Sequence, residues 1–354
     1  MFTRMFAGLN LGTSATAAAY LRNNTNWRGF LANGDVGGFA SRLATTNELT
    51  GQGGGLVRNG GFPENFIVNN PQFNNVTYNT NPGSSTYHSL QTQVTFRPTN
   101  GLSFQSTYVW SKGLASATTG FLNPVDRSLD RTLQASHRTH DFRTNGSFEL
   151  PIGPNKLLLS NSSGWLARIV ERWQLTWIAN MNSGAPLNIT GTDTYVNGGR
   201  LNIVGPFPKN LGNAKMTNGL PNYFSEEGFL FQTDPGCQSV TTLQNLRNQC
   251  TNNVLTDAHG GFLLQNSPPG TLGTLGDRWI EGPGSFRFDL GASKTFQIDE
   301  TKSVQIRVDA RNVLNHPIMG NPSLGINTAS MFGQISGNNV TGARQFQGQL
   351  RVTF

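Results

Sequence analysis

The sequence offers few side chains arranged for catalysis or metal binding. His137, His140 and Asp141 carry metal-binding atoms, but strand residues three apart point to opposite faces, so this spacing favours a polar stretch at a strand end over a metal site. Glu226 and Glu227 are adjacent carboxylates with no recognisable acid/base partner, which favours solvated loop residues. Ser, His and Asp occur without the spacing of a nucleophile elbow. We therefore expect no enzyme activity, no metal and no cofactor.

Two further features of the sequence could carry chemistry. The glycine-dense stretch 51–61 lacks the Gly-Lys-Ser/Thr ending of a phosphate-binding loop, so we interpret it as a loop. Cys237 and Cys250 lie in a polar segment without a His pair at zinc-ligand spacing. This context favours a disulfide in an oxidising compartment over two free thiols.

The remaining chemistry lies in charged residues that recur at alternate positions. They would share the polar face of extended strands: Arg143, Glu149, Arg287, Asp289, Arg307, Asp309, Arg311 and Arg351. Such a face could guide an anionic solute or could hold ion pairs in a wet interior, and we favour the ion pairs. The argument depends on the strands that would position these side chains.

The last eleven residues show the required strand pattern most clearly. Side chains alternate between an apolar set that ends at Phe354 and a polar set that includes Arg351. About ten residues of alternating pattern, tilted, can cross the hydrocarbon of a bilayer. The aromatic terminus Phe354 resembles the signal by which outer-membrane proteins are recognised for insertion.

The same period recurs in six earlier segments: 87–97, 102–110, 142–150, 173–182, 286–293 and 304–311. Within these segments no charged residue falls on the apolar face, where an Arg or Lys at mid-bilayer would cost about 2–4 kcal/mol. Tyr108, Trp110, Trp173 and Trp177 on that face are either interface girdle residues or ordinary lipid-facing bulk, and we favour the girdle for the Trp residues. A short helical turn is expected over 163–171, as an interfacial helix or a simple connector.

Short and long connections alternate along the chain. Turns at 98–101, 151–171 and 298–301 would lie at one end, and connections at 112–138, 185–284 and 315–343 at the other. Outer-membrane barrels have short periplasmic turns and long extracellular loops, so we expect Phe354 to be periplasmic and the cysteines extracellular. A soluble β-sandwich has no reason to segregate loop length in this way.

Composition agrees with a β-structure that has a polar interior. Hydrophobic residues make up 36% of the chain and charged residues 13%, while no run of eighteen apolar residues forms an ordinary transmembrane helix. The formal net charge is +7, but the basic residues are dispersed along the sequence, so we expect no nucleic-acid partner.

The predicted fold is therefore all-β. It is an antiparallel transmembrane β-barrel, represented by carboxyl-terminal strands, in the bacterial outer membrane. We divide the chain into a loop-rich segment, residues 1–85, with one or two strands at most, and the barrel strands, residues 86–354, which include a long extracellular loop at 185–284.

Several short motifs resemble the barrel of Oar-type TonB-dependent receptors. They are Tyr87-His88-Ser89-Leu90-Gln91, Phe148-Glu149-Leu150-Pro151-Ile152-Gly153, Ser183-Gly184-Ala185-Pro186 and Arg311-Asn312-Val313-Leu314-Asn315-His316-Pro317. The resemblance covers roughly residues 80–354 and implies a receptor barrel that a regulatory domain and a plug precede. We find no signal peptide, TonB box or plug here, and expect the chain to be the carboxyl-terminal part of such a receptor.

The resemblance implies uptake of a scarce or bulky solute through an unidentified extracellular ligand site. Its expected partners are outer-membrane lipid, the TonB complex through the plug, and the barrel-assembly machinery. The alternative is a structural or adhesive surface protein that uses the barrel as an anchor for the 185–284 loop.

Overall fold

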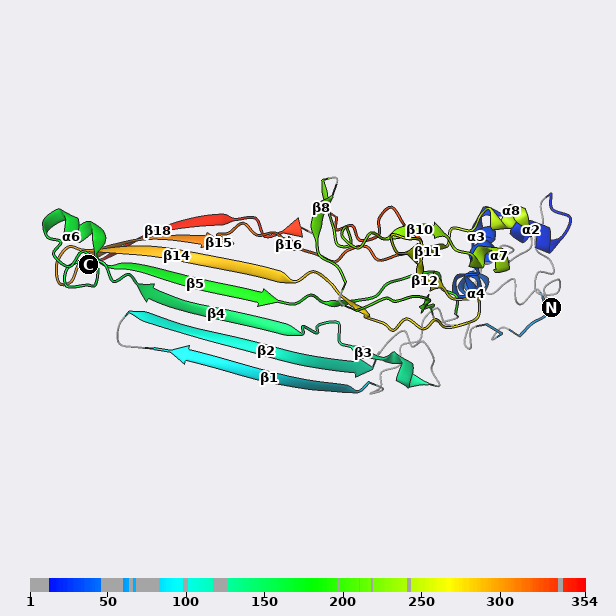
Figure 1. The fold of residues 1–354 in the computed structure, drawn as a ribbon, viewed down its shortest axis with the longest axis horizontal. Helices are drawn as coiled ribbons and strands as arrows, with labels where there is room; N and C mark the ends of the chain where they lie inside the picture. Colours follow the sequence, from blue (N-terminus) through cyan, green and yellow to red (C-terminus); the bar gives the residue numbers. More distant parts are fainter. Residues whose placement is uncertain are drawn as a thin grey trace.

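A single long antiparallel sheet organises the molecule (Figure 1). The computed structural model describes residues 13–45, 60–63, 66–67, 83–97, 101–116, 126–195, 198–209, 211–217, 219–240, 243–336 and 340–354. The predicted loop at 51–59 and the turn residues 98–100 lie outside the described residues.

All seven predicted strand segments form strands of this sheet, in chain order. They are β1 (Ser85–Phe96), β2 (Leu102–Ser116), β4 (His140–Glu149), β5 (Trp173–Asn182), β14 (Ser285–Gln297), β15 (Ser303–Arg311) and β18 (Gln345–Thr353). Each pairs with the next in antiparallel register, and the short strand β3 (Arg131–Leu133) adds to β2.

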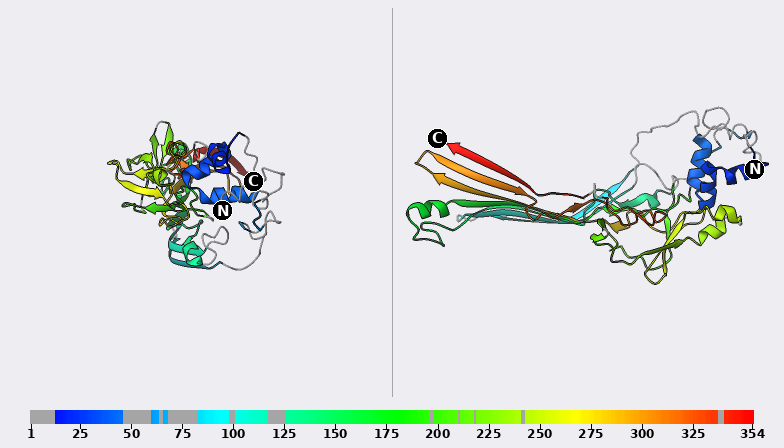
Figure 2. Two further views of the ribbon diagram at one scale, coloured as in Figure 1. Left: turned by 90° about the vertical axis from the view of Figure 1, so that its right-hand side faces the viewer. Right: turned by 90° about the horizontal axis from the view of Figure 1, so that it is seen from above.

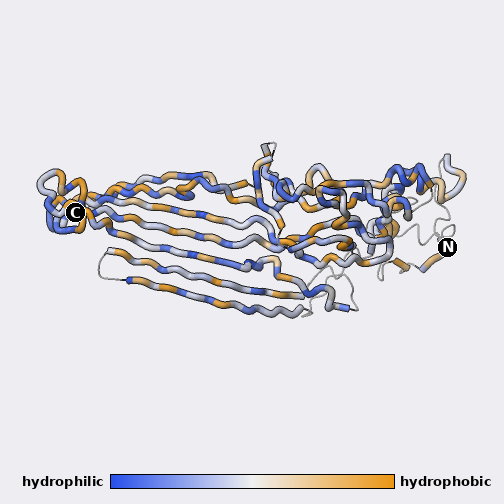
Figure 3. The backbone as a smooth tube through the Cα atoms, viewed as in Figure 1, coloured by the Kyte–Doolittle hydropathy of each residue, from blue (hydrophilic) through white to orange (hydrophobic). Residues whose placement is uncertain are grey.

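The sheet has an apolar face and a polar face. The apolar face carries Leu90, Trp110, Leu175, Phe288, Ile306 and Leu350, and the polar face carries the alternate residues, a pattern visible along the strands in Figure 3. Apolar side chains are exposed on β1, β15 and β18, where Leu90, Val308 and Leu350 are 58%, 47% and 68% exposed. A soluble sandwich would bury them against a second sheet, whereas an apolar outer face is what a membrane barrel presents to lipid.

The connections sort by length between the two ends of the sheet. The short-turn end holds Gly101, the turn at 298–302 and the helix α6 (Gly164–Val170), which confirms the predicted helical turn. The long-connection end holds everything else that is folded (Figure 1). Among the described residues, no helix is long and apolar enough to cross a membrane.

The connection at 185–284 was predicted as a long loop, and the structure shows that this loop is folded. It contains β6 (Pro186–Leu187), β7 (Leu201–Ile203), β8 (Lys215–Thr217), β9 (Leu220–Asn222), β10 (Leu230–Thr233), α7 (Gly236–Val240), α8 (Gln244–Arg247), β11 (Asn253–Thr256), β12 (Phe262–Asn266) and β13 (Ile280–Glu281). Residues 323–335 pack against it, and together they bury a core that includes Leu201, Leu255, Leu264, Ile326 and Ile335. We call residues 185–284 with 323–335 the end unit. Two short strands flank residues 323–335 in the sequence: β16 (Ile318–Met319) precedes them and β17 (Val340–Thr341) follows them.

Residues 1–85 were predicted to be loop with one or two strands, but their described part is mainly helical. It forms α2 (Ala17–Asn23), α3 (Thr25–Asn33) and α4 (Val36–Thr45). Thr16 and Asn24 cap two of these helices, accepting hydrogen bonds from the backbone N–H groups of Ala19 (3.1 Å) and Asn26 (2.8 Å). Leu21, Trp27 and Leu43 form a small buried core, which explains why a Gly- and Asn-rich segment folds into helices.

The helices pack on the far side of the end unit. The Oδ1 atom of Asn33 accepts a hydrogen bond from the backbone N–H of Thr251 (2.7 Å), and the backbone N–H of Gly37 donates to the carbonyl of Asp193 (3.0 Å). The protein therefore consists of a bare sheet at one end and a packed end unit with helices at the other (Figure 2).

Candidate functional site

A hollow of about 820 Å³ lies against the polar face and contacts six strands. It extends from Thr95 and Arg97, at the end of β1, to Arg311 on β15. One hollow can touch so many strands because the sheet bends around it, as the right-hand view of Figure 2 shows for β14, β15 and β18. The polar face is therefore the concave face, which is the arrangement of a barrel wall with a wet interior.

Five of the eight charged residues predicted for the polar face line this hollow: Arg143, Asp289, Arg307, Asp309 and Arg311. The other three lie elsewhere on the same face. Glu149 ends β4 beside Gly101, Arg287 lies two residues before Asp289, and Arg351 lies opposite Gln305 on β18.

Ion pairs between residues two apart on one strand dominate this wall. Arg143 pairs with Asp141 on β4 (2.7 Å), Arg287 with Asp289 on β14 (2.9 Å) and Arg307 with Asp309 on β15 (2.9 Å). Residues two apart share a face, so each pair fits the strand period without bending the backbone. Each pair neutralises an Arg side chain while it keeps the wall polar, and Asp141 is a partner that the sequence prediction missed.

Asp289 also connects the wall to the long-connection end. Its Oδ1 accepts hydrogen bonds from Arg287 Nε (2.9 Å) and from the backbone N–H of Asn312 (2.7 Å). Asn312 follows β15 directly, so this contact fixes the point at which the strand turns into the next connection.

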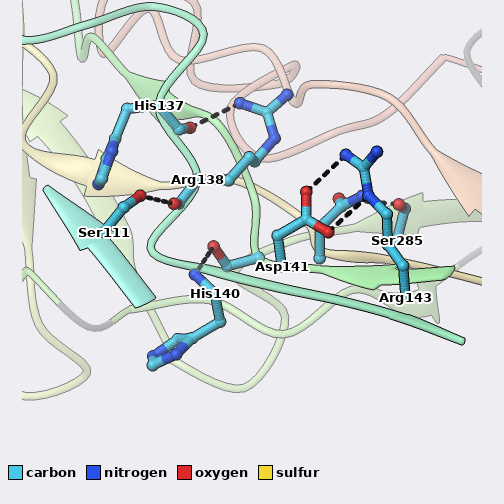
Figure 4. A network of polar contacts seen from close by, with 9 residues as sticks. Ser111, His137, Arg138, His140, Asp141, Arg143 and Ser285 are labelled. Carbon is cyan, nitrogen blue, oxygen red and sulfur yellow. Dashed lines mark hydrogen bonds and ion pairs between the residues drawn. The ribbon is translucent and has the colours of Figure 1, made fainter. Parts of the chain in front are cut away.

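A polar network joins the ends of β2, β4 and β5 beside this wall (Figure 4). The Ser111 hydroxyl donates to the carbonyl of Arg138 (2.9 Å), and the backbone N–H of His140 donates to the Ser183 hydroxyl (3.1 Å). His137 is buried, and its Nδ1 accepts from the backbone N–H of Gly113 (3.3 Å). These contacts hold the end of β2, which extends beyond its pairing with β4, against the residues that precede β4.

The three candidate metal ligands in this region have other partners. His137 bonds to Gly113, His140 Nδ1 lies 2.8 Å from the Tyr108 hydroxyl, and Asp141 pairs with Arg143. Within the described ranges, no group of three or more His, Cys, Asp or Glu side chains could hold a metal ion.

The adjacent carboxylates in the end unit also have structural contacts. Glu226 pairs with Lys215, and Glu227 accepts from the backbone N–H of Gly212 (3.2 Å). Cys237 and Cys250 form a disulfide with a Cα–Cα distance of 5.9 Å, which joins α7 to the residues after α8. Phe354 ends the chain with its side chain 94% exposed.

Lys112 and Lys294 lie on the apolar face, just beyond the predicted segments in which no charged residue was expected there. β14 continues to Gln297, beyond the predicted segment 286–293, and this places Lys294 on the same face as Phe288. Its ammonium donates to the carbonyl of Glu171, just after α6, and lies 5.0 Å from the ring centre of Phe296. The connection around α6 thus shields this charge near the short-turn end.

The Trp positions differ in depth along the strands. Trp173 begins β5 at the short-turn end, and Trp110 pairs with His140, the first residue of β4, at the opposite end. Trp177 lies at the middle of β5, where its ring covers Gly146; a Cβ there would come within 2.4 Å of the ring. Two of the three are therefore placed for an interface girdle, and the third fills the middle of the apolar face.

Comparison with known proteins agrees with this architecture. The family model described as "Outer membrane beta barrel domain" matches residues 24–347. Among curated proteins, none matches this sequence. The match covers the whole sheet except its last residues, together with the end unit and helices α3 and α4. The chain belongs to the outer membrane beta barrel domain family and is an outer-membrane β-barrel protein.

Proposed function

We propose that the chain forms part of a TonB-dependent receptor that takes up a scarce or bulky solute. The observation that carries the proposal is the concave wall, where paired charges line a hollow of about 820 Å³ behind an apolar outer face. A polar interior lets a solute pass or a plug domain sit within the barrel, while the apolar face meets lipid. The resemblance to Oar-type receptors supports the coupling to TonB.

The end unit fits the proposal as the part that captures ligand outside the cell. It has its own buried core and disulfide, so it can hold a binding surface in a fixed shape at the long-connection end. We place that end outside the cell, because long connections of such barrels are extracellular. We propose no catalytic step.

Uptake can be tested without knowing the solute. The gene for this protein and, separately, the gene for TonB are inactivated in the source bacterium, and the solutes removed from a complex growth medium are compared by mass spectrometry of the spent medium. We expect at least one solute to remain in the medium of both mutants. Restoring the protein without residues 186–281 should leave that solute in the medium, although the barrel is present in the outer membrane.

Two results would contradict the proposal. Unchanged solute depletion in the mutant that lacks this protein would exclude an uptake role, and depletion that needs this protein but not TonB would exclude energy coupling. Loss of surface attachment with normal depletion would instead support the adhesive alternative, in which the sheet anchors the end unit.

A further inference from the structure

A second hollow, of about 960 Å³, lies at the long-connection end of β1 and β2. The strand residues that line it include Leu90, Trp110, Lys112 and Leu114, which all belong to the apolar face. Arg131 confirms the side, because its guanidinium donates to the hydroxyl of Thr86 (2.8 Å), and Thr86 pairs with Leu114. This hollow therefore lies on the lipid side of the sheet, separate from the polar wall.

Cations gather in this hollow although they are far apart in sequence. Its lining includes Lys112, Arg131, Arg200, Lys209 and Arg278, and one carboxylate, Asp277, which pairs with Arg200 (2.9 Å). The end unit supplies three of these cations, and β2 and β3 supply the others. The excess of positive charge indicates an anionic ligand.

Several of the cations are held in place before any ligand arrives. The Arg278 guanidinium donates to the carbonyl of Leu133 and to the hydroxyl of Thr132 (3.1 Å). Lys209 lies 4.5 Å from the ring centre of Trp279, which also lines the hollow. A site whose donors are already positioned loses less side-chain entropy on binding.

The position of the hollow along the strands, at the end of the apolar belt, favours a lipid phosphate as the anion. Trp110 is 54% exposed on the apolar face, next to Leu90 on the neighbouring strand, and Lys112 follows it at the next position on that face. Aromatic side chains at the end of an apolar belt mark the level of lipid headgroups. Basic side chains at that level meet the phosphate groups of lipids, which Lys and Arg bind through charge-assisted hydrogen bonds.

We propose that this hollow binds the phosphate-bearing headgroup of a membrane lipid. Arg131, Lys112 and Lys209 contact the phosphate, while Trp110 and Leu90 pack against the attached glycan or acyl chain. The site clamps the end unit to the membrane surface, since its cations come from both the sheet and the end unit. This role goes beyond uptake and does not depend on it.

The test measures which lipid the purified protein retains after reconstitution in a defined bilayer. The protein is reconstituted in nanodiscs of phosphatidylcholine that contain either lipid A with its phosphates or the dephosphorylated form, and retained lipid is counted by native mass spectrometry. We expect preferential retention of the phosphorylated form. The double variant Lys112→Gln/Lys209→Gln should weaken retention about tenfold or more, because two charge-assisted contacts are lost.

The matched control is Lys156→Gln/Lys302→Gln, which removes two exposed lysines at the short-turn end and should leave retention unchanged. Folding of each variant is checked by the shift in gel mobility on heating. Equal retention of phosphorylated lipid by the Lys112/Lys209 variant would overturn the proposal. So would binding of glucose 1-phosphate or inorganic phosphate that displaces the lipid, since the site would then serve a soluble anion.

Discussion

Asn312 is a buried residue that links the end of β15 to His316 and Gly342. Its side chain is 2% exposed; Nδ2 donates to the carbonyls of His316 (2.8 Å) and Gly342, and Oδ1 accepts from the backbone N–H of His316 (3.1 Å). Its backbone adopts a left-handed conformation (φ 47°), which Asn tolerates better than most residues. These contacts give a physical reason for Asn within the Arg311–Pro317 motif.

The Asn312→Ala variant should therefore be strongly destabilised. The substitution removes three hydrogen bonds of a buried side chain, which should lower the free energy of unfolding by about 2–4 kcal/mol. Urea unfolding in detergent micelles, followed by tryptophan fluorescence, measures the change. Asn161→Ala, at an exposed position of the α6 connection, is the matched control and should behave as the unsubstituted protein. Equal unfolding midpoints for the two variants would show that Asn312 carries no such role.

His137 should make the long-connection end sensitive to acid. Burial lowers its pKa from the usual 6.5; nearby Glu281 opposes this shift, and Arg138 and Lys112 add to it. The neutral ring also suits the contact in which Gly113 N–H donates to Nδ1. The unfolded chain therefore takes up a proton first as the pH falls. The stabilisation is complete above 6.5 and is lost as the pH falls through the lower folded-state pKa.

Thermal unfolding measured over a pH series tests this prediction. The His137→Asn variant keeps an acceptor for Gly113 but cannot titrate, so its unfolding temperature should fall less below pH 6.5 than that of the unsubstituted protein. His259→Asn, at an exposed turn position, should leave the pH profile unchanged. Parallel pH profiles for the unsubstituted protein and the His137 variant would contradict the assignment.

Among the strands, the length of the alternating apolar and polar pattern decides which ones could be predicted from the sequence. The seven long strands repeat apolar and polar residues over nine to fifteen residues, which is enough for the pattern to stand out and to assign the charged residues to one face. The strands of the end unit have two to five residues, too few to show a period. Lys294 was missed because it lies just beyond the segment that showed the pattern.

The cations of the lipid-side hollow could not be predicted for a different reason. Lys112, Arg131 and Arg278 are separated by up to 166 residues and come together only because the end unit folds back against β2 and β3. The helices at 17–45 were missed because their stability comes from capping residues and from Trp27 in a small core, and not from strong helix propensity.

The end unit should respond to core substitutions independently of the sheet. Leu264 is completely buried on β12, where it pairs with Ile203 of β7 and with Leu255 of β11. Leu264→Ala should cost about 2–5 kcal/mol, because it leaves a cavity in this core. Limited proteolysis should then cut within residues 186–281, while the gel mobility shift of the barrel remains. Leu157→Ala, at a position that is 84% exposed, is the control and should not change the cleavage pattern.

The whole molecule has two parts, one suited to water and the other to the hydrocarbon of a bilayer. The end unit and helices bury cores of their own, as a protein in water does, whereas the long sheet leaves its apolar face open. Bare apolar surface of this extent in water would promote aggregation, but in a bilayer it meets hydrocarbon. The fold therefore makes sense only at a membrane boundary, with the end unit in water.

The two edge strands of the sheet lead to a prediction about the whole molecule. In the part of the chain that the structure describes, β1 pairs only with β2, and β18 pairs with β15 alone. Each edge strand presents alternate N–H and C=O groups that water cannot reach in hydrocarbon, and each unpaired group would cost several kcal/mol. We therefore expect both edges to be paired with further strand in the outer membrane.

Hydrogen exchange at residue resolution in outer-membrane vesicles measures this pairing. Alternate amides of Gln345–Thr353 donate toward β15, and the others point away from it. Both sets should exchange slowly, and far more slowly than the amide of Leu157 in the exposed turn. If the set that points away from β15 exchanged as fast as Leu157, the edge would be open to water. A closed barrel wall would then be the wrong description of this sheet, because lipid cannot satisfy those groups and only water could.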